Sequence, residues 1–144
     1  MVAYADTGFI VSLYLQESTS LRAIEIARRI TGPLPITQFL LLELRNAFHL
    51  RINRGEIEPG EMTAAWRTFE MDCREKVFFH ASTPFTDTLR LARELSDHLT
   101  PRSGIRSLDL LHLASARILG ASELLTFDQK QAKAARAEGF KVRP

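Results

Sequence analysis

Four acidic side chains occupy positions from which carboxylates could act together: Asp6, Glu43, Asp109 and Asp128. Asp6 and Asp128 each follow a short apolar run and precede a helical pattern, so either could be an ordinary helix N-cap. Asp109 lies in the first turn of a helical segment, where the helix dipole favours an acid by about 0.3–1 kcal/mol. Each of these three has a structural explanation when it is taken alone.

Glu43 is harder to explain in structural terms. It shares one face of a helix with apolar residues, namely Phe39, Leu40, Ala47 and Leu50. Glutamate is rarely buried without a partner, and Arg45 points elsewhere because it is only two positions away. Two explanations stand open for Glu43: a salt bridge to a distant Lys or Arg, and a role as a metal ligand.

The combination of acids points to a metal site. Two carboxylates 4 Å apart repel each other by about 4 kcal/mol at an effective dielectric constant of about 20. A divalent cation removes this cost, and oxygen ligands without a Cys cluster or His pair suit Mg²⁺ or Mn²⁺ better than Zn²⁺. Thr126 lies two residues before Asp128 on the same strand face, so its hydroxyl could bond a neighbouring carboxylate.

Short apolar segments alternate with helical patterns along the chain. Strands are expected at residues 2–5, 34–36, 77–79, 124–127 and 140–142. Helices are expected at 9–15, 18–30, 37–54, 59–75, 84–98, 107–120 and 128–139, with Thr37 and Ser107 as N-caps and a loop over 100–106. This alternation predicts an α/β fold in which a parallel sheet has helices on both faces. Sites in such sheets lie beyond the carboxyl ends of the strands.

Length and composition indicate one domain over residues 1–144. Hydrophobic residues make up 45% and charged residues 25%, which excludes disorder and coiled coils. The single Cys73 allows no internal disulfide, and neither a membrane segment nor a secretion signal is expected, so the cytoplasm is the expected location. The net charge of +2 argues against strong DNA binding. Without the four acids named above, however, the chain has 13 acidic and 19 basic residues, so the rest of the protein carries a formal charge of +6.

Four segments, in this order, resemble the PIN-domain family and, within it, the VapC-type toxins of toxin–antitoxin pairs. They are YADT at residues 4–7, LELRNA at 42–47, RSLDLLHLA at 106–114 and LTFD at 125–128. The resemblance implies a three-layer α/β/α sandwich with a short, mostly parallel central sheet. It also implies a Mg²⁺-dependent endoribonuclease, with Mn²⁺ able to substitute, that is held inactive by a cognate antitoxin and commonly forms a homodimer.

Residue by residue, Asp6, Glu43, Asp109 and Asp128 match the acidic catalytic and metal-binding quartet of that family. Thr7 and Thr126 match positions with a supporting hydroxyl. Asp6 and Asp109 are assigned as the most direct ligands, whereas Glu43 and Asp128 act through water or orient the nucleophile. The expected reaction is in-line attack of an activated water on RNA, leaving a 5′-phosphate and a 3′-hydroxyl.

Several alternatives remain open on the sequence. The chain could be a non-catalytic PIN-like module that binds a protein, or a metal-dependent phosphatase, although no Gly-rich phosphate loop supports the latter. Arg106 could bind a phosphate or form a surface salt bridge. His112, three residues after Asp109 on the same helix face, could contact RNA or hold a carboxylate, but a packed, hydrogen-bonded histidine is expected. Three arginines of the long helix could line an RNA path or form a solvated face: Arg45, Arg51 and Arg54.

Overall fold

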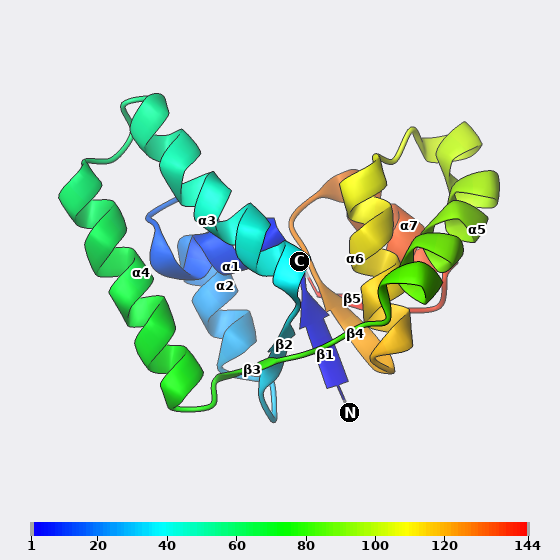
Figure 1. The fold of residues 1–144 in the computed structure, drawn as a ribbon, viewed down its shortest axis with the longest axis horizontal. Helices are drawn as coiled ribbons and strands as arrows, with labels where there is room; N and C mark the ends of the chain where they lie inside the picture. The colour runs from blue at the N-terminus through cyan, green and yellow to red at the C-terminus, as the bar shows by residue number, and fades with distance from the viewer. Residues whose placement is uncertain (1, 144) are drawn as a thin grey trace.

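The computed structural model describes residues 2–143, which form alternating short strands and helices (Figure 1). The strands are β1 (Val2–Ala5), β2 (Leu34–Ile36), β3 (Phe78–His80), β4 (Ala121–Leu125) and β5 (Lys141–Arg143). The helices are α1 (Thr7–Tyr14), α2 (Ser20–Ala27), α3 (Gln38–Asn53), α4 (Pro59–Arg74), α5 (Phe85–Ser103), α6 (Ser107–Ile118) and α7 (Gln129–Ala137). The expected α/β class and the order of elements are confirmed.

All the strand pairs are parallel, as the sequence predicts, but they form two ladders rather than one continuous sheet. Strands β1, β4 and β5 are hydrogen-bonded in the order β1-β4-β5, and β2 pairs with β3. Strand β2 contacts β1 at the junction of the two ladders. The carboxyl ends of β1 and β4 meet because Ala5 is paired with Leu125. The residues that follow these two strands are therefore brought together.

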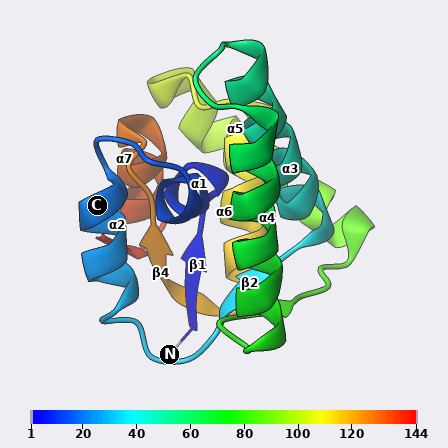
Figure 2. The same cartoon turned by 90° about the vertical axis from the view of Figure 1, so that its left-hand side faces the viewer.

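The helices form two groups on either side of the strands. Helices α1 to α4 pack on one another, and α5 packs on α6 and α7 on the opposite side. In Figure 1 the arrowhead of β1 points toward the space between α3 and α6, and the view in Figure 2 places α4 on the outside of its group. The chain crosses between the two groups in the extended segment that contains β3.

Local sequence explains where the helices that carry the acids begin. Asp6 is the N-cap of α1 and accepts from Phe9 N at 2.9 Å, while Asp128 is the N-cap of α7 and accepts from Gln131 N at 2.7 Å. Thr37 caps α3 as predicted, accepting from Leu40 N at 3.3 Å. Three helices around the site therefore begin at a residue whose side chain accepts a hydrogen bond from a backbone N–H of the same helix.

Two boundary predictions around α5 and α6 were wrong. Helix α5 does not stop near His98 but continues through Pro101 to Ser103, so residues 100–103 are helical. Pro101 lies in the last turn, and the helix ends instead at Gly104, which adopts φ 66° and donates its N–H to Thr100 O at 2.8 Å. Ser107 is the first helical residue of α6, and Arg106 holds the N-cap position without a side-chain bond.

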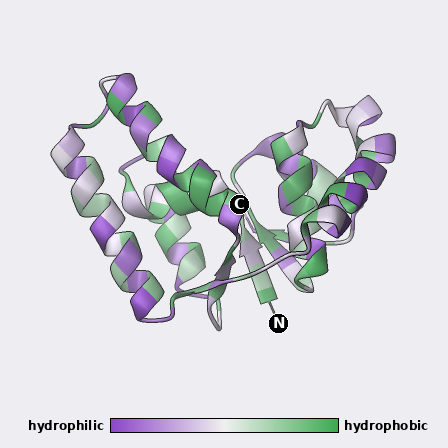
Figure 3. Cartoon of the chain, in the orientation of Figure 1, coloured by the Kyte–Doolittle hydropathy of each residue, from purple (hydrophilic) through white to green (hydrophobic). Residues whose placement is uncertain are grey.

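Strand β4 is displaced from the expected 124–127. It ends at Leu125, so Asp128 lies three residues beyond the strand, whereas Asp6 directly follows β1. Burial is concentrated in β1, β4 and the inner faces of α3 and α6, where Tyr4, Leu44, Leu113 and Leu124 have no exposed area. Figure 3 shows hydrophobic colour on the inner parts of α3 and α6 and more hydrophilic colour on α4 and α5. Among residues 2–143, no helix is long and apolar enough to cross a membrane.

Candidate functional site

An open cavity of about 970 Å³ lies where α3, α6 and the start of α7 approach one another. Three of the four predicted acids line it, namely Glu43, Asp109 and Asp128. Asp6 does not line this cavity, because it is buried with 8% of its surface exposed. The fold thus brings three carboxylates to one opening and places the fourth in the protein interior beside them.

Asp6 and Asp128 are connected through Thr126. The Thr126 hydroxyl donates a short hydrogen bond to Oδ2 of Asp6, and its oxygen accepts the backbone N–H of Asp128 at 3.0 Å. Thr126 has no exposed area, so this connection is shielded from water. The Thr126 hydroxyl, for which the resemblance implies a supporting role, therefore contacts two of the acidic residues directly.

The acids perturb one another electrostatically. Burial is the main reason that the pKa of Asp6 is raised above its usual range, and the charge of Asp109 raises it further, against the lowering effects of Thr126 and His112. The pKa of Asp109 is also raised, first by burial and then by the charge of Asp128, with a smaller contribution from Glu43. Burial and neighbouring carboxylates therefore both disfavour the ionised forms of Asp6 and Asp109.

Glu43 is half-buried on α3, and its Oε1 has two partners. The Thr7 hydroxyl donates to Oε1 at 3.0 Å, and Nε2 of His112 lies 2.7 Å from the same oxygen. The structure thus gives Glu43 a histidine partner in place of the Lys or Arg considered from the sequence. Thr7, predicted as a supporting hydroxyl, contacts this acid.

His112 and Tyr4 lie beside the acids, and of the two only His112 was considered from the sequence, as a residue that could hold a carboxylate. His112 is 2% exposed and Tyr4 has no exposed area, and Nδ1 of His112 lies 2.8 Å from the Tyr4 hydroxyl oxygen. The expectation of a packed, hydrogen-bonded histidine is correct in its geometry. The spacing in the sequence indicates that His112 lies near Asp109, since it follows Asp109 by three residues and shares its helix face.

Gln131 is a second residue that the sequence reasoning overlooked. Its backbone N–H donates to Oδ1 of Asp128, the N-cap of α7, and its side-chain Nε2 donates to the backbone oxygen of Asp109 at 3.3 Å. Its Oε1 is buried and has no hydrogen-bond partner among the described residues. Gln131 therefore joins the segments that carry Asp109 and Asp128, which explains why a polar side chain with no exposed area is placed here.

Basic residues line the cavity beside the acids. Arg106 and Lys130 are both exposed lining residues. The arginines of α3 are less available, because Arg51 pairs with Glu17 and Glu56 and the Arg45 guanidinium lies 4.6 Å from the Trp66 ring centre. Positive charge next to the acids therefore comes from the starts of α6 and α7.

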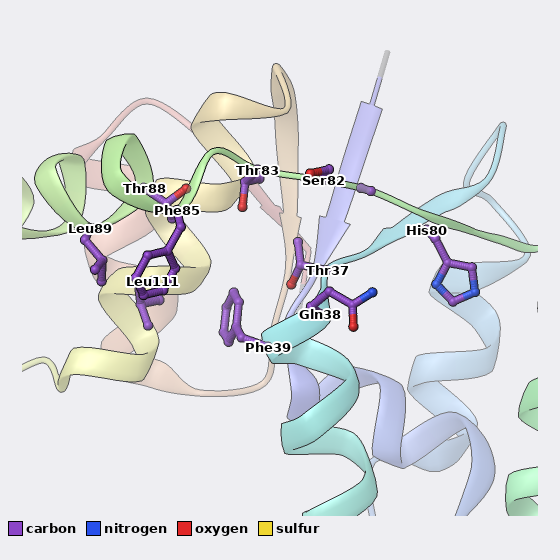
Figure 4. Close-up of a pocket in the computed structure, with 11 residues that line it drawn as sticks. Thr37, Gln38, Phe39, His80, Ser82, Thr83, Phe85, Thr88, Leu89 and Leu111 are labelled. Atoms are coloured by element: carbon purple, nitrogen blue, oxygen red, sulfur yellow. The ribbon is translucent and has the colours of Figure 1, made fainter.

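A smaller cavity of about 270 Å³ lies beside α3, α5 and the segment after β3 (Figure 4). Its lining is mostly apolar and includes Phe39, Phe85, Leu89 and Leu111. Phe39 also contacts His112, with ring centres 4.8 Å apart. No ionised acid lines this second cavity, which makes it unsuitable for the chemistry considered above.

The donor set fits a hard divalent cation in its chemistry. Carboxylate oxygens are the preferred ligands of Mg²⁺, and the pKa of Asp109 is raised by burial and then by the negative charges of Asp128 and Glu43. Across residues 2–143, however, no three His, Cys, Asp or Glu side chains stand close enough to hold one ion. Three carboxylates line a common cavity, but across the described residues no three of these side chains surround one position that an ion could occupy.

Comparison with known proteins identifies the family. A model of the PIN domain matches residues 3–137. The chain belongs to the PIN domain family. No curated protein matches this PIN domain sequence.

Solved structures share the fold of this PIN domain at low sequence identity. VapBC2 from Rickettsia felis, bound to a DNA fragment from its promoter, has a TM-score of 0.64 at 17% identity, covering 99% of this chain and 98% of that one. VapC20 from Mycobacterium tuberculosis, a toxin that cleaves the sarcin–ricin loop, has a TM-score of 0.61 at 17% identity over 99% of both chains. FitAcB from Neisseria gonorrhoeae gives 0.63 at 13% identity, covering 99% and 97%.

Proposed function

We propose that this PIN domain is the toxin of a toxin–antitoxin pair and hydrolyses RNA phosphodiester bonds with Mg²⁺, for which Mn²⁺ can substitute. One observation carries the proposal: Glu43, Asp109 and Asp128 line one cavity, with Asp6 buried beside them and hydrogen-bonded to the same network. Family membership supports it, because the sequence segments that resemble the PIN domain are those that carry these acids.

The four acids would hold the metal, which when bound lowers the pKa of a water molecule and neutralises phosphate charge. The protein's own part is to keep these carboxylates in place. Thr126 bonds Asp6, and Thr7 and His112 bond Glu43. Asp128 accepts from Gln131 N, which fixes its orientation at the start of α7. Each acid therefore has a side-chain or backbone partner that sets its direction, and for Asp109 this partner is the backbone of Arg106.

Arg106 and Lys130 would bind the substrate. Both are exposed at the cavity that Asp109 and Asp128 line, so an RNA phosphate beside the acids would meet positive charge. The formal +6 outside the quartet would attract the rest of the RNA backbone. The expected products are a 5′-phosphate and a 3′-hydroxyl.

The partners follow from the same assignment. Similar structures include a toxin–antitoxin complex from Klebsiella pneumoniae, with a TM-score of 0.56 at 17% identity, covering 90% of this chain and 88% of that one. We expect a cognate antitoxin to cover the cavity, a second copy of the chain to form a homodimer, and the protein to act in the cytoplasm. A short adjacent gene that encodes a DNA-binding head and a flexible tail would support the toxin assignment.

A non-catalytic PIN-like module that only binds a protein is the second candidate. The observation in its favour is that the carboxylates of residues 2–143 do not enclose an ion as they stand. Such a module would cleave no RNA with Mg²⁺ or Mn²⁺ after its partner has been removed. Retention of all four acids in this chain favours the nuclease over this candidate.

The direct test is cleavage of end-labelled total RNA by the purified chain with Mg²⁺, with Mn²⁺ and with a chelator. We expect cleavage with either metal, none with the chelator, and none by Asp109→Asn. Asp87→Asn is the matched control, because Asp87 is an exposed acid on α5 that pairs with Arg90 at 3.0 Å, outside the site. Activity on a generic phosphomonoester but not on RNA would select a phosphatase instead.

Expression in cells gives an independent test. We expect the wild-type chain and Asp87→Asn to arrest growth and both Asp6→Ala and Asp109→Ala to relieve the arrest. Full toxicity in both acid variants would contradict the proposal. Mapping the cleavage sites on total RNA after brief induction would then identify the RNA target.

A further inference from the structure

His112 has a partner on each ring nitrogen, although it is almost completely buried. Nδ1 lies 2.8 Å from the Tyr4 hydroxyl oxygen, and Nε2 lies 2.7 Å from Oε1 of Glu43 and 3.3 Å from the Thr7 hydroxyl. A neutral imidazole has one donor and one acceptor nitrogen, and both are satisfied here. This arrangement places the ring as a link between a tyrosine in the sheet and an acid at the cavity.

The direction of the hydrogen bonds follows from the partners. A carboxylate oxygen can only accept, so Nε2 must carry the hydrogen in its 2.7 Å contact with Glu43. In a neutral imidazole Nδ1 is then an acceptor, and the donor facing it is the Tyr4 hydroxyl. Burial raises the pKa of Tyr4 well above its usual value, so that this hydroxyl keeps its hydrogen. The chain of donation therefore runs from Tyr4 through His112 to Glu43.

The link joins the two groups of helices. Tyr4 lies on β1, His112 on α6 and Glu43 on α3, and Figure 1 shows α3 and α6 on opposite sides of the end of β1. Asp6 and Asp109 lie on the same segments as the first two of these residues, at short distances along the chain. Phe39, one turn before Glu43, also packs against the His112 ring. His112 thus relates the position of Glu43 on α3 to Asp109 on α6, while Thr7, which directly follows Asp6, contacts the same oxygen from α1.

The Glu43 carboxylate is bonded on one side only. Among residues 2–143, its partners Thr7 and His112 both contact Oε1. Glu43 itself lines the cavity and has 21% of its side chain exposed. The hydrogen bonds to Oε1 therefore fix the carboxylate, while no residue from 2 to 143 bonds the second oxygen and competes with a ligand there.

We propose that His112 is a positioning residue for Glu43, held by Tyr4, and that this link sets the Glu43 carboxylate relative to Asp6 and Asp109 across the two helix groups. The proposal rests on the proposed nuclease function for its consequences in activity. Its geometry can be tested without activity. No proton transfer to substrate is assigned to the imidazole.

The kinetic test uses Tyr4→Phe and His112→Leu, with His98→Gln as the control because His98 is exposed and bonds Glu138 at 2.6 Å outside the cavity. Residues that orient metal ligands typically contribute about 10–100-fold to activity or metal affinity, so we expect a fall of that size in kcat for both variants, with little change in KM for RNA. His98→Gln should retain wild-type values. Unchanged kcat in folded His112→Leu would overturn the proposal.

A double-mutant cycle separates positioning from general packing. If His112 acts through Glu43, adding His112→Leu to a Glu43→Gln enzyme should cost less than about twofold in kcat, since the residue that it positions is already altered. Losses that multiply in the double variant would assign His112 to packing and overturn the proposal. Tyr4→Phe keeps the aromatic ring, so it provides the same comparison if His112→Leu does not fold.

Nitrogen-15 NMR of the His112 ring in the metal-free protein tests the link without any turnover. We expect the Nε2-protonated tautomer in the wild type, a shifted Hε2 resonance in Glu43→Gln, and a loss of tautomer preference in Tyr4→Phe. A dominant Nδ1-protonated tautomer would overturn the proposal. If the wild-type chain cleaves no RNA, the nuclease function fails, and this spectrum still decides whether His112 bonds Glu43.

Discussion

Thr126 donates its hydroxyl hydrogen to Asp6 across 120 positions of the sequence, and this one side chain joins the acid at the start of α1 to the acid at the start of α7. The contact is possible because β1 and β4 are parallel neighbours whose last residues, Ala5 and Leu125, are paired. Residues one step beyond such a pair lie at the same edge of the sheet. The acidic site is therefore a direct consequence of strand register.

Removal of this hydroxyl should destabilise the protein and impair the site. Thr126→Val keeps the shape of the side chain but removes the hydrogen bonds to Oδ2 of buried Asp6 and to the backbone N–H of Asp128, and an unsatisfied buried group costs about 1–3 kcal/mol. We expect a lower free energy of unfolding in urea and weaker RNA cleavage. Thr126→Ser should restore both, because it retains the hydroxyl. A Thr126→Val protein as stable and active as the wild type would contradict the assigned role.

The charge of Asp128 and its function as a helix cap can be measured separately. Asp128→Ala removes the bond to Gln131 N and should lower the free energy of unfolding by about 0.5–2 kcal/mol. Asp128→Asn keeps a capping oxygen, so its stability should stay near that of the wild type while RNA cleavage is lost with the charge. Full cleavage by Asp128→Asn would show that Asp128 only caps α7.

The sequence was sufficient to predict the α/β class, the parallel strands, the order of elements and which acids come together. These features depend on local patterns and on the rule that parallel strands direct their carboxyl ends to one edge. The end of α5 was mispredicted, because a loop was expected over residues 100–106, a segment that contains Pro101. The helix continues through this proline to Ser103. The break between the two ladders has no signal in strand composition.

The partners of the acids could not be predicted in the same way. His112 meets Glu43 across 69 positions and Tyr4 across 108, and the sequence reasoning offered Glu43 only a Lys or Arg partner. Gln131 joins α7 to α6 through a backbone oxygen, which no side-chain pattern reveals. Such contacts depend on how the two helix groups are placed, and this is decided by tertiary packing rather than by local spacing.

Stability should respond to pH in opposite ways at Asp109 and Glu123. The pKa of Asp109 is raised in the folded state, mainly by burial, so its contribution to stability is present below the unfolded pKa and is lost as pH rises through the folded pKa. Asp109→Asn should therefore stabilise the metal-free protein at pH 7 and have little effect near pH 3. The hydrogen bond from Arg143 lowers the pKa of Glu123 in the folded state. Glu123→Gln should therefore destabilise the protein at pH 7, and this loss of stability should disappear as the pH falls below the usual pKa range of carboxylates.

Urea unfolding of the two variants and the wild type across this pH range checks both signs. Glu123 serves as the matched control because it lies on β4 and bonds Arg143 at 2.6 Å, and it does not line the acidic cavity. Destabilisation by Asp109→Asn at pH 7 would show that its carboxylate is stabilised by contacts and would contradict the repulsion inferred for the site.

Arg106 should contribute to RNA binding through a phosphate. It is exposed at the cavity, is the N-cap residue of α6 and lies one turn before Asp109, so it can meet a phosphate next to the acids. Arg106→Gln should raise KM for RNA and reduce the magnitude of the salt slope of binding by about 1, because one fewer phosphate contact releases fewer counterions. Stability should stay near the wild-type value, since no side-chain bond of Arg106 caps α6.

Arg67→Gln is the matched control for this charge, because Arg67 is exposed on α4 and does not line the acidic cavity. RNA binding by filter retention or fluorescence anisotropy, measured over a series of salt concentrations for a catalytically inactive Asp109→Asn background, gives the slope without cleavage. The expected pattern is a smaller slope for Arg106→Gln and an unchanged slope for Arg67→Gln. Equal slopes for both variants would mean that Arg106 provides only general surface charge, and the RNA path would then have to be sought on other basic residues such as Lys130.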